Sequence, residues 1–421
     1  MKFCSTTLGC KVNQYETQAV ESILVRRGHF LVKPGEGCDV YIINTCLVTA
    51  ESARKSRQAI RRARRLEPGA KIAVCGCFSQ LEPDEALKLG ADLVSGTGDG
   101  VKFALEAEAL VERGDVRQGD GSTVLLPGAV AGRTRALLKI QDGCDNICSY
   151  CIVPYARGRS RSLPLETVAG HARLLESKGF REIVITGIEI SSYGKDIESN
   201  ATLADAVHII GGAAPGARLR LGSLDPGAVT GSFCAQLQTI GNLCGHFHLA
   251  LQSGCDETLL RMGRKYDTGT VRSVISRLRD SFPGCGITAD LITGFPGETD
   301  GEFETTLAFI KEAAFSGMHV FPYSQRPGTP AAALPGQISR IVRQGRASVA
   351  AAVAKKMADE FRLGQVGKIR GVLFERKTGG YWDGLTDNYI RIAVKNGGAR
   401  NTVLPVRITG ADGSLVWGEV D

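Results

Sequence analysis

The sequence lacks any long apolar run. Hydrophobic residues make up 43% of its 421 residues, yet no stretch approaches the roughly 20 consecutive apolar residues that span a bilayer. The opening MKFCSTTLGC has no basic region followed by an apolar core, which is the pattern of a secretory signal. Low-complexity tracts and convincing internal repeats are absent as well. We therefore expect no membrane association and a cytoplasmic globular protein of about three domains, because single domains usually run to roughly 100–200 residues.

Disulfide bonds are not expected either, although the chain contains 13 cysteines. The cytoplasm keeps thiols reduced, so these residues need another explanation. Four of them stand in apolar or turn contexts without ligand spacing and are predicted to be core residues: Cys234, Cys244, Cys255 and Cys285. Two groups of three stand out among the others.

One group lies in GCDNICSYC, at 143–151, where Cys144, Cys148 and Cys151 have the spacing C-x3-C-x2-C. No fourth cysteine or histidine lies nearby in the sequence. A structural zinc site takes four ligands, and catalytic zinc sites seldom use three thiolates. A redox C-x-x-C pair would leave Cys144 unexplained. Thiolates suit iron–sulfur clusters, so this spacing favours a [4Fe–4S] cluster with three irons held by the protein and one left open.

The other group comes from the first hundred residues, where strand-like and helix-like segments alternate. This rhythm predicts a parallel, doubly wound sheet. Its three strand candidates end in Cys10, Cys46 and Cys77. Ligands bind outside the carboxyl ends of such strands, so these thiols should meet at one edge and hold a second cluster with a second open iron. Cys75 should point to the opposite strand face and belong to the core.

The rest of the chain predicts two further units. Residues from about 100 to 132 read as a linker with a short hairpin at 118–128. Six strand candidates separated by helices then predict a partial (β/α)6 barrel with its active site at the C-terminal strand ends; they are 136–140, 182–188, 217–223, 246–253, 286–294 and 317–324. A long helix at 340–364 leads out. Five short strands from about Gln365 predict a small antiparallel β-barrel of the kind often used on RNA.

The predicted fold class is therefore α/β, with an N-terminal doubly wound parallel sheet, a central partial (β/α)6 barrel and a small C-terminal antiparallel β-barrel. The predicted domains are 1–115, which would hold the N-terminal cluster, 130–360, which would hold the second cluster, and 365–421, which would bind RNA.

The motif at 144–151 resembles that of the radical S-adenosylmethionine (SAM) superfamily, which is C-x3-C-x2-C with an aromatic residue, here Tyr150, before the last cysteine. The resemblance implies that SAM chelates the open iron and is split by one electron into methionine and a 5′-deoxyadenosyl radical, while the protein positions it. It also implies a SAM pocket formed by Tyr150, Thr186, Gly187, Glu189, Ser223, Gln252 and Phe295. For each single residue, the alternative is an ordinary satisfied group at a strand end.

Longer motifs along the whole chain closely resemble the methylthiotransferases, which place a methylthio group on an unreactive carbon. They are LGCKVNQYET, NTCLVTAES, GCFSQ, GCDNICSYCIVPYARGRSRS, LALQSGCDETLLRMGRKY, DLITGFPGET and FPYSQRPGTPAA, followed by a terminal TRAM-like β-barrel. Within the family, LGCKVNQ looks like the MtaB-type branch. The branch acting on isopentenyladenosine reads closer to GCQMN, and the ribosomal-protein branch reads closer to GCPKN.

This resemblance implies conversion of N6-threonylcarbamoyladenosine, beside the tRNA anticodon, to its 2-methylthio derivative. One SAM would methylate sulfur held on the N-terminal cluster, and a second SAM on the other cluster would supply the radical. Arg157, Arg159 and Arg161 would hold the threonylcarbamoyl carboxylate or RNA phosphates, since planar guanidinium groups suit both. The implied partners are the tRNA anticodon stem-loop, a sulfur donor and a reductant protein such as flavodoxin or ferredoxin.

Other functions stay open at this point. The chain could be a methylthiotransferase for isopentenyladenosine in tRNA or for a ribosomal protein. It could also be a non-catalytic RNA-binding protein in which the cysteines hold a structural iron–sulfur cluster or zinc. The net charge of +7 and the arginine-rich run at 53–67 fit RNA binding. The same run could equally be a solvated helix face.

Overall fold

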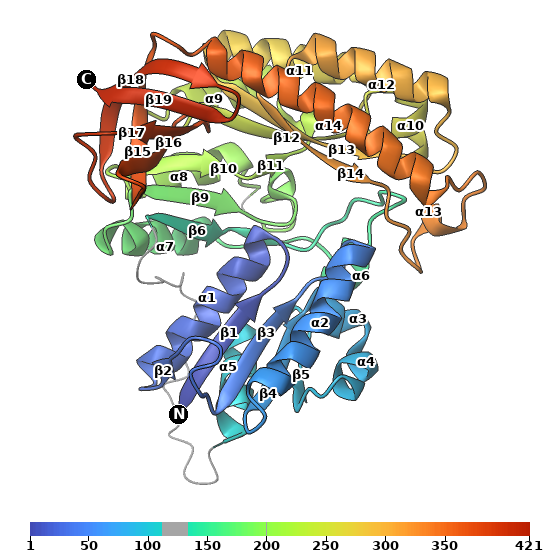
Figure 1. Ribbon diagram of the computed structural model, residues 1–421, viewed down its shortest axis with the longest axis vertical. Coiled ribbons are helices and arrows are strands. Elements are labelled where there is room, and N and C mark those ends of the chain that lie inside the picture. Colours follow the sequence, from blue (N-terminus) through green and yellow to red (C-terminus); the bar gives the residue numbers. More distant parts are fainter. Residues whose placement is uncertain (112–133, 199) are drawn as a thin grey trace.

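The structure is a computed structural model that describes residues 1–111, 134–198 and 200–421. Figure 1 shows three units: an N-terminal sheet with its helices (blue), a central barrel (green to orange) above it, and a small C-terminal barrel (red) against one end of the central barrel. The hairpin predicted at 118–128 lies outside the described residues.

The N-terminal unit is a five-stranded sheet in the order β2-β1-β3-β4-β5, with every pair parallel. Its strands are β1 (Lys2–Thr7), β2 (Phe30–Leu31), β3 (Val40–Thr45), β4 (Lys71–Gly76) and β5 (Leu93–Val94). Its helices are α1 (Lys11–Arg26), α2 (Ala50–Leu66), α3 (Cys77–Leu81), α4 (Pro83–Lys88) and α5 (Gly100–Ala109). Separate apolar clusters join α1 and α5 to one sheet face and α2 and α4 to the other. The predicted doubly wound sheet is confirmed.

One prediction for this unit is wrong. The linker was expected to begin near residue 100, but Gly100–Ala109 forms the helix α5. The Asp99 carboxylate accepts hydrogen bonds from the backbone N–H groups of Val101 and Lys102 and caps the helix. Phe103 and Ala107 lie one turn apart and pack into the apolar cluster on the α1 face. The glycine-rich segment before α5 masked this signal.

The central unit contains the six predicted strands. They are β6 (Arg135–Lys139), β9 (Glu182–Thr186), β10 (Arg218–Leu221) continued by β11 (Ser223–Leu224), β12 (His246–Gln252), β13 (Gly286–Thr293) and β14 (Gly317–Pro322). All pairings among them are parallel, in the sheets β10-β9-β6 and β11-β12-β13-β14. The third strand breaks at Gly222, where a Cβ atom would lie 3.0 Å from the Ile185 carbonyl oxygen. The ring remains open between β6 and β14, as expected of a partial (β/α)6 barrel.

Helices cover the outside of this barrel. The longer ones are α7 (Leu165–Ser177), α8 (Leu203–Ala213), α9 (Gly231–Gln238), α11 (Thr268–Ser281), α12 (Asp300–Ala313) and α14 (Arg340–Leu363). Shorter elements are β7 (Gln141–Asp142), α6 (Val153–Arg157), β8 (Arg161–Ser162), η1 (Ile190–Ser192), η2 (Pro226–Ala228), α10 (Asp256–Arg261) and α13 (Pro330–Ala333). The largest apolar cluster fills the space between strands and helices. None of the described helices is both long and apolar enough to cross a membrane.

The barrel strands alternate between packed and solvent-accessible side chains. In β12, Phe247 and Leu249 are fully buried against the helices, whereas His248 on the other face keeps some exposure. In β13, Thr288 and Asp290 alternate in the same way with buried apolar residues. Since strand residues point alternately to opposite faces, the accessible set lines the barrel interior, which is polar.

The C-terminal unit is a closed five-stranded barrel in the order β15-β16-β17-β19-β18. Its strands are β15 (Ile369–Thr378), β16 (Tyr381–Thr386), β17 (Arg391–Val394), β18 (Val403–Asp412) and β19 (Leu415–Val420). The predicted small antiparallel β-barrel is confirmed, with one departure: β17 pairs with β19 in parallel to close the ring. Closure removes the exposed edges that an open sheet of this size would leave.

The C-terminal barrel closes the lower end of the central barrel. Tyr389 stacks on His246 at the start of β12, with ring centroids 4.3 Å apart, and the Arg220 guanidinium lies over the Tyr389 ring, 5.0 Å from its centroid. Arg218 donates to the Leu385 carbonyl oxygen at 2.7 Å. Here the lower end of the barrel is the end at which its strands begin, and the upper end is the one at which they stop; in Figure 1 these ends lie to the left and to the right, and the N-terminal unit lies below the barrel.

Candidate active site

Cys10, Cys46 and Cys77 lie at the carboxyl ends of three adjacent strands. Cys10 caps the N-terminus of α1, Cys46 directly follows β3, and Cys77 is the first residue of α3. The chain between them packs closely: a Cβ atom at Gly9 would lie 2.9 Å from the Cys46 Cβ, and Gly9 has a φ of +103°. Only glycine meets both requirements at this position. The predicted convergence of three thiols at one edge therefore exists.

Polar side chains hold these loops together. The Cys10 thiol donates to Asn13 Oδ1 at 3.3 Å, and Asn13 Nδ2 donates to the Thr45 carbonyl oxygen at 2.9 Å. Ser56 of α2 accepts from the Cys46 N–H at 3.0 Å and donates to the Cys46 carbonyl oxygen at 2.8 Å. Two of the three cysteines are thus positioned by side chains that are themselves buried.

Cys75 belongs to a different environment from Cys77. It packs among apolar residues on the α1 and α5 face, whereas Cys77 packs on the α2 face. This confirms the predicted core position of Cys75. Burial raises the pKa of the Cys77 thiol to about 12 against the opposing charge of Arg157, and the charges of Cys46 and Cys10 raise it further. Cys77 therefore belongs to the same edge of the sheet as Cys10 and Cys46.

Two buried arginines flank this first trio. Arg157 and Arg326 are both nearly inaccessible to solvent, and the Nε atom of each has no hydrogen-bond partner among the described residues. The charge of Arg157 acts on Cys10 and Cys77, and the charge of Cys46 acts on Arg326. A buried unpaired donor is costly. An anionic group held by three thiolates would compensate both guanidinium groups, so the donor set fits an iron–sulfur cluster.

Cys144, Cys148 and Cys151 lie in the loop between β7 and α6. The Cys151 N–H donates to the Cys148 carbonyl oxygen at 3.0 Å, which turns the loop back on itself. Arg264 Nη1 donates to the Cys148 sulfur at 3.0 Å. Burial raises the pKa of the Cys151 thiol to about 12, and the charges of Cys148 and Cys144 add to this. These three cysteines, the second trio, therefore share one loop at the upper end of the barrel.

A cavity of about 300 Å³ adjoins this second trio. Its lining includes Cys148, Glu189, Asp225 and Arg264. Arg264 Nη2 lies 2.7 Å from Asp225 Oδ2. Burial and the charge of Asp225 raise the pKa of Glu189, so a cation bound in the cavity would be favoured. Asp225 and Arg264 were not among the predicted site residues, although both stand inside recognisable motifs, RLGSLDP and RMGRKY.

The other predicted SAM contacts lie outside the lining of this cavity. Phe295 is fully buried and meets Tyr150 edge-on, with centroids 6.4 Å apart. Thr186 is buried at the end of β9, and Gly187 packs against Gln141 so closely that a Cβ atom would lie 2.9 Å from its carbonyl oxygen. The remaining two are placed at strand ends: Ser223 is exposed and Gln252 has the uncommon φ of +66°.

The three predicted substrate arginines separate in space. Arg159 and Arg161 are exposed, whereas the Arg157 side chain is 1% exposed and points into the N-terminal unit. Arg157 Nη1 lies 2.8 Å from Glu16 Oε1 of α1 and 3.0 Å from Asp142 Oδ1. Arg157 and Arg161 also line a hollow of about 830 Å³ between the two units, whose lining contains none of the six cysteines.

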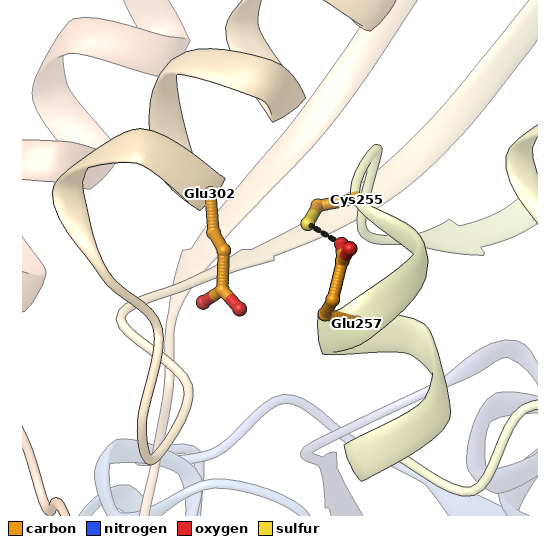
Figure 2. Close-up of side chains that lie close together, drawn as sticks. All are labelled: Cys255, Glu257 and Glu302. Carbon is orange, nitrogen blue, oxygen red and sulfur yellow. Dashed lines mark hydrogen bonds between the residues drawn. The ribbon is translucent and has the colours of Figure 1, made fainter.

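A third group of side chains of the kinds that bind metals holds the fold together instead. Figure 2 shows Cys255, Glu257 and Glu302 side by side, with the Cys255 thiol donating to Glu257 at 2.9 Å. Glu302 accepts two hydrogen bonds from Arg261, at 2.9 and 2.7 Å, and caps the start of α12. These donors are already satisfied by the protein. Cys255 is 1% exposed, and the predicted core cysteines are all buried: Cys234, Cys244, Cys255 and Cys285.

The fold and the two trios define a radical SAM enzyme. The family model described as "Radical SAM superfamily" matches residues 138–310, and the one described as "Uncharacterized protein family UPF0004" matches residues 2–96. Among solved structures, TsrM from Kitasatospora setae, a radical S-adenosylmethionine methyltransferase, aligns with a TM-score of 0.57 at 15% identity, covering 90% of this chain and 79% of that chain. This likeness concerns the fold alone.

The names of similar curated proteins specify the reaction more closely than the fold does. The threonylcarbamoyladenosine tRNA methylthiotransferases MtaB of Thermotoga maritima and Bacillus subtilis are 38% and 36% identical, covering 88% and 92% of this chain and 85% and 89% of their own lengths. A tRNA-2-methylthio-N(6)-dimethylallyladenosine synthase of Symbiobacterium thermophilum is 32% identical over 98% of this chain and 93% of its own length. The chain belongs to the tRNA methylthiotransferase family of radical SAM enzymes. Its cofactors are SAM and two [4Fe–4S] clusters.

Proposed function

We propose that this enzyme adds a methylthio group to C2 of N6-threonylcarbamoyladenosine beside the tRNA anticodon. The observation that carries the proposal is the pair of three-cysteine sites, one at the sheet edge and one at the upper end of the barrel. The two relatives whose names specify threonylcarbamoyladenosine are more similar to this chain than the relative named for dimethylallyladenosine. The name of the Symbiobacterium thermophilum relative gives the alternative substrate, N6-dimethylallyladenosine in tRNA.

Each trio offers three thiolates, so a [4Fe–4S] cluster held by either one would keep one iron open for a further ligand. We assign Cys144, Cys148 and Cys151 to the cluster that binds SAM, because the 300 Å³ cavity adjoins Cys148. We assign Cys10, Cys46 and Cys77 to the cluster that carries the sulfur. When bound, SAM supplies a methyl group in one role and, after accepting an electron, the activation of the adenine carbon in the other.

The chain's own residues bind and orient these groups. Glu189 and Arg264 offer charges of both signs to the ammonium and carboxylate groups of SAM. Arg159 and Arg161 are exposed beside the second trio and would contact RNA phosphates, which position the nucleic acid without reading its sequence. The C-terminal barrel, with residues 365–421, would extend the RNA contact, and 1–115 and 130–360 would carry one cluster each.

The base must leave its stack to reach both clusters. Enzymes that modify a base commonly extrude it from the nucleic acid, and RNA loops present such bases readily. Turnover needs a sulfur donor and a reductant. We propose that the reductant is a protein such as flavodoxin or ferredoxin. We propose that the enzyme works in the cytoplasm, together with tRNA and these two partners.

Anaerobic reconstitution of the full chain tests this function. The reconstituted protein, given SAM, a reductant and a threonylcarbamoylated anticodon stem-loop, should bind about eight irons per chain, in two four-iron clusters. It should cleave SAM and add the mass of one CH2S unit to the nucleoside. A product on the dimethylallyladenosine stem-loop alone would overturn the substrate assignment. Bound zinc without SAM cleavage would instead show a non-catalytic RNA-binding protein.

A further inference from the structure

The outer face of α2 carries a stripe of cations. The buried residues of this helix recur at spacings of three and four positions and face the sheet; they are Ala53, Ser56, Ile60 and Ala63. Exposed polar residues occupy the positions between them and point to solvent; they are Arg54, Lys55, Gln58, Arg61, Arg62 and Arg65. The arginine-rich run of the sequence is therefore concentrated on one accessible side of a single helix.

Ion pairs within the protein compensate part of this charge. Arg57 lies 2.7 Å from Glu85 of α4, and Arg64 pairs with Asp92, which precedes β5. These two arginines join α2 to neighbouring segments of the N-terminal unit. Arg54 pairs with an acidic residue of its own helix. None of these three arginines needs an external anion.

Three arginines in the last turns of α2 differ from the others. Arg61, Arg62 and Arg65 are exposed, and within residues 1–111, 134–198 and 200–421 they have neither an ion-pair nor a hydrogen-bond partner. We call them the α2 arginine surface. They line a hollow of about 640 Å³ that is completed by Gln58, Arg64 and Leu89. No acidic side chain belongs to this described lining, so the hollow should attract anions.

The other end of α2 lies at the candidate active site. The helix begins four residues after Cys46, and Ser56 accepts a hydrogen bond from the Cys46 N–H. The Ala50 N–H donates to Ser324 Oγ, just beyond β14, at 2.8 Å. Figure 1 shows α2 along the outside of the N-terminal sheet, with its first turn toward the central barrel. At 1.5 Å per residue, the α2 arginine surface lies roughly 16–22 Å along the helix from its first residue.

We propose that Arg61, Arg62 and Arg65 bind phosphate groups in the double-stranded stem of the tRNA anticodon stem-loop, while the loop presents its base to the two clusters; this rests on the proposed function. Planar guanidinium groups suit phosphate by geometry as well as by charge. Phosphate contacts fix the position and orientation of a nucleic acid without reading its sequence. Contacts at the far end of α2 would therefore orient the stem relative to the first trio.

The composition of this surface favours RNA over an acidic partner protein. Protein–protein interfaces have a core of apolar and aromatic side chains from which charged residues are depleted. In the described lining of the hollow, Leu89 is the apolar side chain, and it is only partly exposed. Clustered arginines on one helix face, without an apolar centre, instead match the electrostatic pattern of a nucleic-acid contact.

The test pairs two proteins with two RNAs. Wild-type holoenzyme and the triple variant Arg61→Gln, Arg62→Gln, Arg65→Gln would be titrated anaerobically with fluorescent RNAs at several salt concentrations. One RNA is the complete anticodon stem-loop, and the other is an oligonucleotide of the loop alone. For the stem-loop, we expect binding to weaken by about 10-fold or more at low salt, and the slope of log Kd against log salt to become shallower by about 2 to 3. For the loop oligonucleotide, affinity should change less than about 2-fold.

A matched control removes the same charge elsewhere. Arg272, Lys311 and Lys355 are exposed on α11, α12 and α14, which Figure 1 shows on the side of the barrel away from the N-terminal unit. Replacing all three by glutamine should change the affinity for the stem-loop less than about 2-fold, because salt screens charges at that distance. Iron content and urea unfolding of each variant are measured first.

Several outcomes overturn the proposal. Unchanged affinity and salt slope would show a solvated helix face. Equal weakening for both RNAs, or the same weakening by the control variant, would show a general charge effect instead of a stem contact. Slower cluster reduction by flavodoxin with unchanged RNA binding would assign the surface to an acidic protein.

Single substitutions keep the test decisive if the triple variant does not assemble both clusters. Each of Arg61→Gln, Arg62→Gln and Arg65→Gln should then make the salt slope for the stem-loop shallower by about 1. Three unchanged slopes overturn the proposal. Failure of the wild type to methylthiolate the natural stem-loop would refute the proposed function separately, since binding is measured without turnover.

Discussion

Arg157 and Glu16 lie 2.8 Å apart across the boundary between the barrel and the N-terminal sheet, although 141 residues separate them in the chain. Arg157 Nη2 also donates to Asn13 Oδ1 at 2.9 Å, and Asn13 in turn accepts from the Cys10 thiol. One side chain, six residues beyond the second trio, therefore reaches the first. This contact joins the two cysteine sites physically.

Replacing Arg157 by glutamine should destabilise the whole protein. The change leaves Glu16 and Asp142 largely buried without their main cation, and breaking a buried ion pair typically costs about 3–5 kcal/mol. Urea unfolding of the full chain measures the loss. Arg54→Gln is the matched control, because Arg54 and its partner Glu51 are both more than half exposed; its effect should stay below about 1 kcal/mol. Equal effects of the two substitutions would refute the buried role.

Replacing Cys46 by alanine should separate the two clusters. The variant should lose the iron of the first trio, keep about four irons on the second, and still cleave SAM without transferring sulfur. Cys75→Ala is the control, because Cys75 lies on the opposite sheet face and should keep about eight irons and full product formation. Loss of SAM cleavage in Cys46→Ala would contradict separate roles for the two trios.

Replacing Arg264 by methionine should weaken SAM binding by about 10-fold or more, since the change removes a charge-assisted donor from the cavity beside Cys148. Anaerobic equilibrium dialysis with SAM measures this directly. Arg272→Met is the control, because Arg272 pairs with Glu312 on the protein surface. If both variants bind SAM like the wild type, the cofactor must occupy a different cavity.

Because Glu182 is ion-paired with Arg218 and Arg220, we expect the free energy of unfolding to depend on pH in the acid range. Burial alone would raise the pKa of Glu182, but the charges of Arg220 and Arg218 overcome this and lower it to about 2. The stabilisation is present above the unfolded pKa of about 4.3 and is lost as pH falls toward 2; it amounts to roughly 3 kcal/mol. The destabilisation caused by Glu182→Gln, measured by urea unfolding, should therefore shrink as pH is lowered through this window. Glu360→Gln, on the exposed end of α14, provides the control. A pH-independent difference would refute the coupling.

The spacing of the cysteines and the strand pattern were sufficient to predict the architecture. Strands that end in Cys10, Cys46 and Cys77 could be read from their apolar runs, and parallel pairing then requires the thiols to share an edge. The predicted position of Cys75 followed from strand periodicity alone. These inferences depend on local patterns of the chain.

Contacts between distant segments could not be predicted in this way. Arg157 stands in an arginine-rich run that resembled an RNA contact, and nothing near it indicates that Glu16 lies opposite. The parallel pairing of β17 with β19 likewise depends on closure of the whole barrel rather than on either strand.

The stacking of Tyr389 on His246 and Arg220 has a practical consequence for minimal versions of this enzyme. The C-terminal barrel covers the end of the central barrel at which the strands begin. A truncation before residue 365 would leave both clusters and their ligands in the chain, yet water would enter the central barrel from below, at the end opposite the cofactor. Such a fragment should consume SAM without productive turnover, and adding RNA at high concentration should not rescue it.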